Sequence, residues 1–233
     1  MRQKKEKAWR DTLGLLFRAH PWHGIELGPR APEIVPVYVE MLPTDAVKYE
    51  LDKMTGFLKV DRPQRFSNQC PSLYGLIPRT LAGPRAAAYC KKKTGRQNLE
   101  GDDDPLDICV LSERPINRAN ILLKARPIGG LRMLDGGEVD DKIIAVLEND
   151  LSYGHWRDID DCPENMMERF EHYFLTYKEM PGAKARETEI THVYGKKEAH
   201  DVIECCRLDY EERFPGLSDL GLTFPETIVQ NNV

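Results

Sequence analysis

The stretch EGDDDPLD, residues 100–107, holds five acidic side chains in eight residues and runs directly into the apolar segment ICVL, residues 108–111. Carboxylates this dense repel one another at neutral pH unless cations bind or some of them are protonated. Pro105 favours an extended chain at Asp104, which would place Asp102 and Asp104 on one side and Asp103 on the other. Asp107 can rejoin the cluster at the start of the next strand. We therefore expect a rigid pocket of oxygen atoms, which suits a hard cation such as Mg²⁺.

A helix–loop–helix calcium site is the main alternative for such a cluster. Its loop would begin at Asp102 and end on Glu113, which has the right residue type at the twelfth position. That loop needs glycine at its sixth position, where this chain has Asp107, and Pro105 is awkward within it. The spacing therefore excludes a calcium loop of this kind.

Length and composition favour a single domain over residues 1–233, because 233 residues that are 41% hydrophobic suffice for one sizeable core. The net charge of −5, with both signs mixed, does not favour a nucleic-acid partner. The chain has no apolar run long enough to span a membrane, and its apolar piece after the basic start is too short for a secretory signal. The six cysteines lack paired metal spacing, which is typical of reduced thiols in the cytoplasm.

Alternation of apolar and polar residues predicts strands at 34–41 and 47–51. Further strands are predicted at 57–60, 108–111, 121–125, 128–133 and 143–146. In the first strand the valines at 35, 37 and 39 form an apolar face, so Glu40 lies on the side that can face a polar cleft. In the second strand Lys48 and Glu50 share the polar face, where a solvated ion pair would be the simplest interpretation. A second acidic loop, residues 135–142, joins two of the later strands as a hairpin.

Helical spacing predicts helices at 1–20, from about 163 to 178 and at 196–214, the second with a capping box formed by Asp161 and Glu164. Residues 1–33 form an N-terminal arm, in which His20 and His23 are better explained by packing than by metal binding. Residues 79–99 form a basic insertion, which we interpret as a solvated loop or subunit contact, with a lid for an anionic substrate as the alternative. Residues 215–233 form a tail.

Residues 102–108 resemble the signature of the soluble family I inorganic pyrophosphatases: Asp, a small or polar residue, Asp, Pro, an apolar residue, Asp and an apolar residue. The similarity extends from about residue 35 to residue 178. It includes a strand that ends in Asp-Arg, a Pro-x-x-Tyr-Gly segment, an acidic loop that closes on lysine, and a Tyr-Lys pair. The chain departs from the bacterial pattern at Cys70 and Leu73, where tyrosine and asparagine are common.

This resemblance implies an α+β, mainly β fold: a small closed OB-like β-barrel flanked by two or three helices. It implies hydrolysis of inorganic pyrophosphate to two orthophosphates by a metal-activated water in a site with several Mg²⁺ ions, by in-line transfer without a covalent intermediate. It also implies a homo-oligomer, either a hexamer or a dimer.

The resemblance further implies a role for each matching residue. Asp102, Asp107 and Asp140 would bind the metals that hold the attacking water, and Asp104 would accept its proton. Glu40 and Asp135 would bind further metals, and Glu50 would support them through water. The leaving phosphate would contact Arg62, Tyr177 and Lys178, and the phosphate under attack would contact Lys48, Tyr74 and Lys142. Asp103 occupies the variable position of the signature and should be dispensable.

Two other functions stay open on the sequence alone. One is a catalytically weak family member that binds a partner through the basic insertion. The other is a metal-dependent hydrolase of a related substrate, such as short polyphosphate or a nucleotide.

Overall fold

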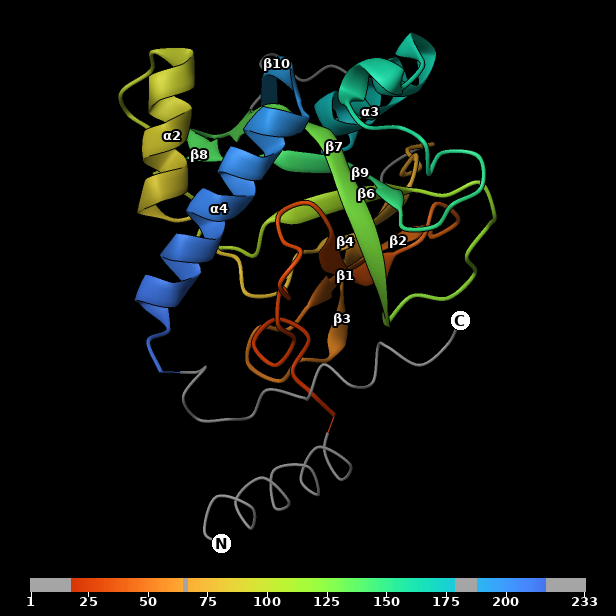
Figure 1. Cartoon of the computed structure of the whole chain (residues 1–233), viewed down its shortest axis with the longest axis horizontal. Coiled ribbons are helices and arrows are strands. Elements are labelled where there is room, and N and C mark those ends of the chain that lie inside the picture. Colours follow the sequence, from red (N-terminus) through yellow and green to blue (C-terminus); the bar gives the residue numbers. More distant parts are fainter. Residues whose placement is uncertain (1–17, 65–66, 179–187, 217–233) are drawn as a thin grey trace, which may run out of the picture.

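The computed structural model describes residues 18–64, 67–178 and 188–216, and within them eight strands form one sheet (Figure 1). These strands are β1 (Val35–Met41), β4 (Leu73–Leu76), β5 (Glu100–Gly101), β6 (Asp107–Leu111), β7 (Ile121–Asp135), β8 (Glu138–Val139), β9 (Lys142–Leu147) and β10 (Thr188–Gly195). Because β1 pairs with both β4 and β7, the order β1-β4-β6-β9-β7 returns on itself as a ring. Strands β2 (Val47–Leu51) and β3 (Leu58–Pro63) form a separate antiparallel hairpin.

Two hydrophobic clusters lie on the two faces of the ring strands, because successive side chains of a strand point to opposite faces. On β6, Ile108 and Val110 join one cluster, whereas Cys109 and Leu111 join the other. The first cluster is covered by α4 (Lys196–Arg213) and by α2 (Pro84–Thr94), and the second is covered by α3 (Glu164–Thr176). Figure 1 shows α2 and α4 side by side and α3 apart from them.

Helix α2 corrects the interpretation of residues 79–99 as a solvated loop. Pro84 stands at the first helical position, where an amide N–H is not needed, and Gly95 ends the helix in the left-handed region at φ +74°. The carboxylate of Asp209 on α4 accepts hydrogen bonds from the amides of Arg85 and Ala86 at 3.0 Å. A side chain more than 100 residues away therefore caps this helix.

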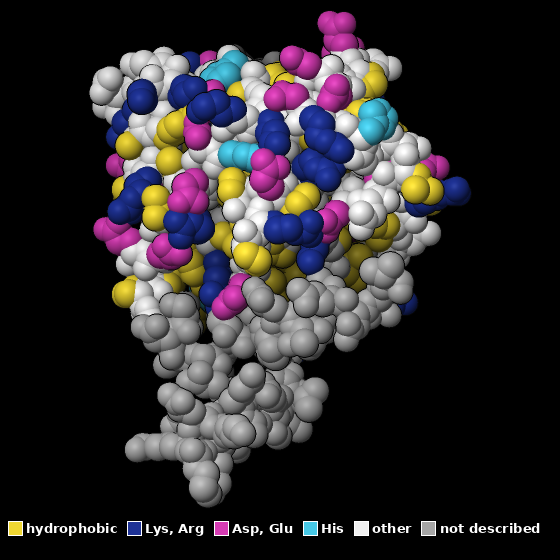
Figure 2. All heavy atoms as spheres, viewed as in Figure 1, with side chains coloured by type: hydrophobic (Ala, Val, Ile, Leu, Met, Phe, Trp, Pro, Cys, Tyr) yellow, Lys and Arg dark blue, Asp and Glu magenta, His cyan; other side chains and the backbone are white. Residues whose placement is uncertain are grey.

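Four of the basic side chains of this segment, Arg79, Arg85, Lys93 and Arg96, pair with acidic ones. Arg85 pairs with Asp209 at 3.2 Å, and Lys93 with Glu198 at 2.5 Å. Figure 2 shows Lys and Arg side chains interspersed with Asp and Glu on the face that carries α2 and α4. The segment is thus fastened to the body of the protein by complementary charges.

Other predictions need smaller corrections. The strands predicted at 121–125 and 128–133 are the two ends of β7, which continues through a register shift between Pro127 and Gly129. The capping box lies one turn earlier than predicted, around the 3₁₀ turn Ile159–Asp161. There the side chains of Asp158 and Asp161 each accept a hydrogen bond from the backbone amide of the other residue. Strand β10 has no counterpart among the strands predicted above.

The N-terminal arm packs against α4, as predicted for a structural role. Trp22 is buried and donates a hydrogen bond from Nε1 to the carbonyl oxygen of Thr80 at 2.8 Å, and His23 contacts the Tyr210 hydroxyl at 2.7 Å. The helix predicted for 1–20 falls almost wholly outside the described residues, as does the tail from 217. Across the described part of the chain, we find no helix with both the length and the apolarity to cross a membrane.

Candidate active site

A cavity of about 200 Å³ gathers the predicted site residues from distant segments. Every one of them except Arg62 lines it: Glu40, Lys48, Glu50, Tyr74, Asp102, Asp104, Asp107, Asp135, Asp140, Lys142, Tyr177 and Lys178. They come from β1, β2, β4, β6, β7, β9, two acidic loops and the end of α3. The guanidinium of Arg62 on β3 lies 5.5 Å from the centre of the Tyr177 ring, beside this cavity.

The acidic loop is a turn rather than the extended chain predicted from Pro105. Asp103 has φ +56°, and the amide of Asp104 donates a hydrogen bond to the Asp102 carboxylate at 2.9 Å. The backbone at 103 and 104 also pairs with Ala82, at 3.1 and 2.8 Å. Asp102 and Asp104 nevertheless line the same cavity, so the expected pocket forms by a different local route.

Strand register brings Lys142 to the acidic cluster. Asp107 opens β6 and Lys142 opens β9, and the two residues are direct partners in this parallel pair. The ammonium of Lys142 pairs with both Asp107 and Asp140. Tyr74 donates a hydrogen bond from its hydroxyl to Asp107 at 2.5 Å. Lys142 is only 2% exposed, so its charge depends on these carboxylates for compensation.

Burial, together with neighbouring carboxylates, raises the pKa of two acids in the cavity. Burial raises the pKa of Glu40 to about 8, and the charge of Asp107 adds to the effect. Burial likewise raises the pKa of Asp102 to about 8, with the charge of Asp140 next in importance. Both carboxylates are therefore costly to ionise where they lie, first because they are removed from water and then because other carboxylates are near.

Each of the remaining lysines in the cavity contacts an acid. Lys53 pairs with Asp104, and Lys178 pairs with Asp135. Lys48 lies 3.5 Å from Glu50, so the simple ion pair considered for that strand does form. Lys48 and Glu50 also line the cavity, which a solvated ion pair alone would not require.

The donor set fits a divalent cation, although the carboxylates are not arranged as a metal site in the structure. Among the described residues, no group of three or more His, Cys, Asp or Glu side chains is placed to hold an ion. The carboxylates contact lysine ammonium groups instead, which supply positive charge where a cation would. Oxygen ligands with unbalanced negative charge are the set that Mg²⁺ prefers.

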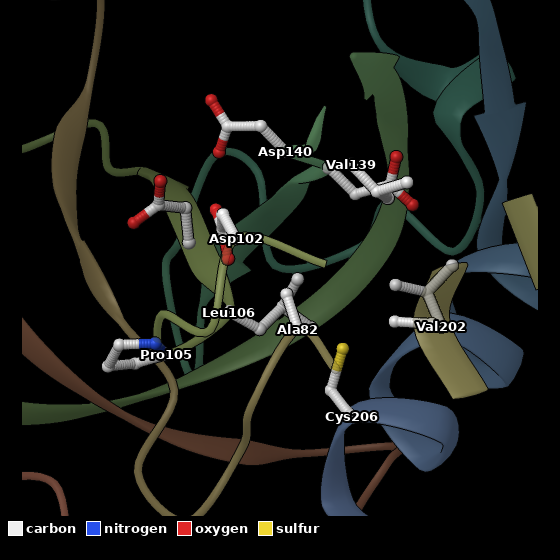
Figure 3. A pocket seen from close by; sticks show the side chains of 11 residues that line it. Ala82, Asp102, Pro105, Leu106, Val139, Asp140, Val202 and Cys206 are labelled. Atoms are coloured by element: carbon white, nitrogen blue, oxygen red, sulfur yellow. The ribbon is translucent and has the colours of Figure 1, made fainter. Parts of the chain in front are cut away.

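A second, very small cavity of about 10 Å³ lies behind three of these acids, Asp102, Asp107 and Asp140. Figure 3 shows Asp102 and Asp140 on one side of it and Val202 and Cys206, both from α4, on the other. Its volume is about that of one water molecule. The acidic cluster therefore lies next to α4, across this small cavity.

Sequence reasoning missed two charged residues of the cavity, Lys53 and Glu138. Glu138 belongs to the second acidic loop and could have been included on that ground. Lys53 follows β2 by two residues, and nothing local distinguishes it from a solvated turn residue. Only the fold brings it to Asp104.

The chain is similar to known proteins in sequence and in structure. The family model described as inorganic pyrophosphatase matches residues 37–211. The chain is 54% identical over 199 residues to an inorganic pyrophosphatase of Chlamydia caviae, covering 84% of this chain and 92% of the relative. It is 42% identical over 160 residues to soluble inorganic pyrophosphatase 1 of Arabidopsis thaliana, covering 69% and 66%. The crystal structure of an inorganic pyrophosphatase from Thermus thermophilus superposes with a TM-score of 0.69 at 30% identity, covering 82% of this chain and 99% of that one.

Proposed function

Because this chain belongs to the inorganic pyrophosphatase family, we propose that it hydrolyses inorganic pyrophosphate to two orthophosphates with bound divalent metal, Mg²⁺ by preference. One observation carries the proposal: acids and cations from segments far apart in the sequence line a single cavity. Pyrophosphate is a compact polyanion. Its hydrolysis needs acidic side chains that bind metal and cationic side chains that bind phosphate in the same cavity.

The acids are the proposed metal ligands. Asp102, Asp107 and Asp140 would hold the ions nearest the attacking water, Glu40 and Asp135 would hold further ions, and Glu50 would support them through water. When bound, divalent metal neutralises phosphate oxygens and lowers the pKa of its water from about 15.7 towards neutrality. The raised pKa values of Glu40 and Asp102 support this assignment, because a bound cation would offset both their burial, which is the larger cause, and the repulsion from neighbouring carboxylates.

Asp104 is the proposed acceptor of the proton from the attacking water. Its side chain is 44% exposed at the edge of the cavity, where water can reach it. Its carboxylate would have to part from Lys53 in order to act, and Lys53 would then be available to the anionic substrate. A general base held beside its proton donor contributes about 100- to 10,000-fold to a rate.

The cations and hydroxyls are the proposed phosphate ligands. Lys48, Tyr74 and Lys142 would contact the phosphate under attack, and Arg62, Tyr177 and Lys178 would contact the leaving phosphate. The position of the Arg62 guanidinium over the Tyr177 ring supports their shared role. Displacement would be in line, and no side chain would bond to phosphorus.

The wider assignments are proposals of the same kind. We propose that the ring of strands is the small closed OB-like barrel of the family, that residues 1–233 form one domain, and that the protein is a cytoplasmic homo-oligomer, hexamer or dimer, with no nucleic-acid or membrane partner. The six cysteines are free thiols, which supports a reducing compartment. Among the described residues none from 79–99 lines the larger cavity, so a lid role for the insertion lacks support.

A phosphate-release assay tests the proposal. Purified full-length protein should release phosphate from pyrophosphate in Mg²⁺, should stop after dialysis against a chelator, and should recover when Mg²⁺ is restored. Tripolyphosphate and ATP in parallel distinguish a pyrophosphatase from a broader phosphoanhydride hydrolase. Absence of release in Mg²⁺, or release that the chelator does not affect, would overturn the proposal.

A further inference from the structure

A completely buried arginine lies behind the candidate active site. Arg132 on β7 is 0% exposed, and its Nε atom lies 3.2 Å from the carboxylate of Asp141. One of its terminal nitrogens donates a hydrogen bond to Glu198 of α4 at 3.0 Å. A guanidinium without access to water needs anionic partners, because burying an uncompensated charge is highly unfavourable.

Two aromatic rings fix the orientation of this guanidinium. Its central carbon lies 5.4 Å from the centre of the Tyr89 ring on α2 and 5.2 Å from that of the Tyr194 ring on β10. Both distances are those of a cation–π contact. Four elements, α2, α4, β7 and β10, therefore meet around Arg132, and its position is defined by all of them.

Asp141 connects this cluster to the candidate active site. It is 5% exposed and lies between Asp140 and Lys142, which both line the larger cavity. Asp141 instead pairs with Arg132, away from that cavity. The amide of Asp140 also donates a hydrogen bond to the carbonyl of Met133 on β7 at 3.0 Å. Contacts with β7 therefore hold the segment 140–142 on the side away from the cavity, while Asp140 and Lys142 line the cavity.

We propose that Arg132 is a positioning residue: its ion pair with Asp141 sets where Asp140 and Lys142 stand in the cavity, and helix α2 contributes to this through Tyr89. The proposal deepens the function proposed above and rests on it wherever metal and substrate are concerned. Arg132 touches neither of them. Loss of a partner that orients a metal ligand typically lowers metal affinity or activity by about 10- to 100-fold.

The test compares three single variants. Arg132→Met keeps an unbranched stem and removes the charged guanidinium, and Asp141→Asn keeps shape and removes the other charge. The control is Asp209→Asn, because Asp209 is equally buried, pairs with Arg85 across the α2–α4 contact, and has partners outside the larger cavity. All three variants lose an ion pair that has at least one fully buried member, but only the first two lose the link to residues 140–142.

Three measurements on the full-length protein separate positioning from general stability: amide hydrogen exchange at 140–142 without metal, Mg²⁺ affinity by calorimetry, and kcat and KM for pyrophosphate. We expect Arg132→Met and Asp141→Asn to speed exchange at 140–142, to weaken Mg²⁺ binding about 10- to 100-fold and to lower kcat more than they raise KM. The double variant Arg132→Met/Asp141→Asn should lose no more Mg²⁺ affinity or kcat than either single variant. Asp209→Asn should match the wild type in all three measurements even though its Tm falls.

The outcomes distinguish this inference from the proposed function. If the wild type neither binds Mg²⁺ nor releases phosphate, the proposed function fails, while hydrogen exchange still tests the anchoring. If the wild type is active and both variants behave like Asp209→Asn, the positioning role is wrong. Should Arg132→Met fail to fold, Asp141→Asn alone decides the question in the same way.

Discussion

Replacing Glu40 with glutamine tests the electrostatic crowding of the cavity. Glu40 is 5% exposed, and its carboxylate accepts a hydrogen bond from the Leu51 amide at 2.7 Å. Burial first, and then the charge of Asp107, raise its pKa to about 8. Glutamine has nearly the same shape and can still accept the hydrogen bond from Leu51. The variant therefore removes the charge and little else.

The size of the effect follows from the pKa. The pKa of Glu40 rises from 4.5 to about 8 on folding. A group of this kind stabilises the fold fully below its unfolded pKa, and that stability is lost as the pH rises through the folded value. At about 1.36 kcal/mol per pKa unit, the loss between about pH 4.5 and pH 8 is at most about 5 kcal/mol. For a chain of this size each kcal/mol changes Tm by about 2–4 °C.

Thermal unfolding in a chelator measures this effect. Wild type and Glu40→Gln should have similar Tm near about pH 4.5, and the variant should be several degrees more stable by about pH 9. Saturating Mg²⁺ should then favour the wild type, because bound cations stabilise its ionised carboxylate. Asp52→Asn on the exposed β2–β3 turn is the control and should show no gain at high pH, because hydrogen bonds from Thr55 lower the pKa of Asp52. A Glu40→Gln variant that follows the wild type at every pH would refute the reasoning.

Three further substitutions test separate parts of the account. Asp104→Asn should fold and bind Mg²⁺ but lose about 100- to 10,000-fold in kcat, whereas Asp103→Asn should keep wild-type turnover in the same phosphate-release assay. Lys142→Met should lower the free energy of unfolding by about 3–5 kcal/mol in denaturant titration, since two carboxylates lose their shared cation. Gly75→Ala should prevent normal folding, seen by circular dichroism, because the added Cβ would lie 1.9 Å from the Tyr38 carbonyl oxygen.

Each of these expectations can fail on its own. Wild-type kcat in Asp104→Asn would remove that residue from proton transfer, and a large loss in Asp103→Asn would mean that the turn itself matters. Unchanged stability in Lys142→Met would show that the two carboxylates are compensated by something other than this ammonium. A normally folded Gly75→Ala protein would contradict the close approach of β1 and β4.

The sequence predicts those strands whose apolar residues are grouped within a few positions. Strands β1, β2 and β6 are confirmed within a residue or two of the predicted ends, because their apolar faces are visible locally. Helix α4 is confirmed for the same reason, since its predicted apolar face is buried. Local periodicity therefore suffices to predict an element whose apolar face is visible in its own residues.

Elements that depend on distant partners were harder to predict. Helix α2 is capped by Asp209 from α4, and the basic composition around it is typical of a loop when those partners are unknown. Strand β10 is defined by its pairing with β7 rather than by a strong pattern of its own. The strand β7 passes through Pro127 because a register shift there accommodates the missing amide.

The candidate site shows the same difference between residues that have a local pattern and residues that are placed by distant contacts. Most of its acids stand in two short motifs that the sequence shows directly, and Glu40 and Glu50 stand on two predicted strands, although the positive φ of Asp103 shows that the predicted local conformation of the first motif was wrong in detail. Lys53 and Arg132 carry no motif. They reach Asp104 and Asp141 only through tertiary packing, which a single sequence does not reveal.

We propose that carboxylates from separate segments share divalent cations in one cavity. Crystals grown in saturating MnCl₂ test it most directly, because Mn²⁺ substitutes for Mg²⁺ on oxygen ligands and is visible by its anomalous scattering. We predict anomalous peaks enclosed by Asp102, Asp107 and Asp140. Manganese bound only at the outer surface, with Lys142 still pairing Asp107 to Asp140 and no ion in the cavity, would contradict it.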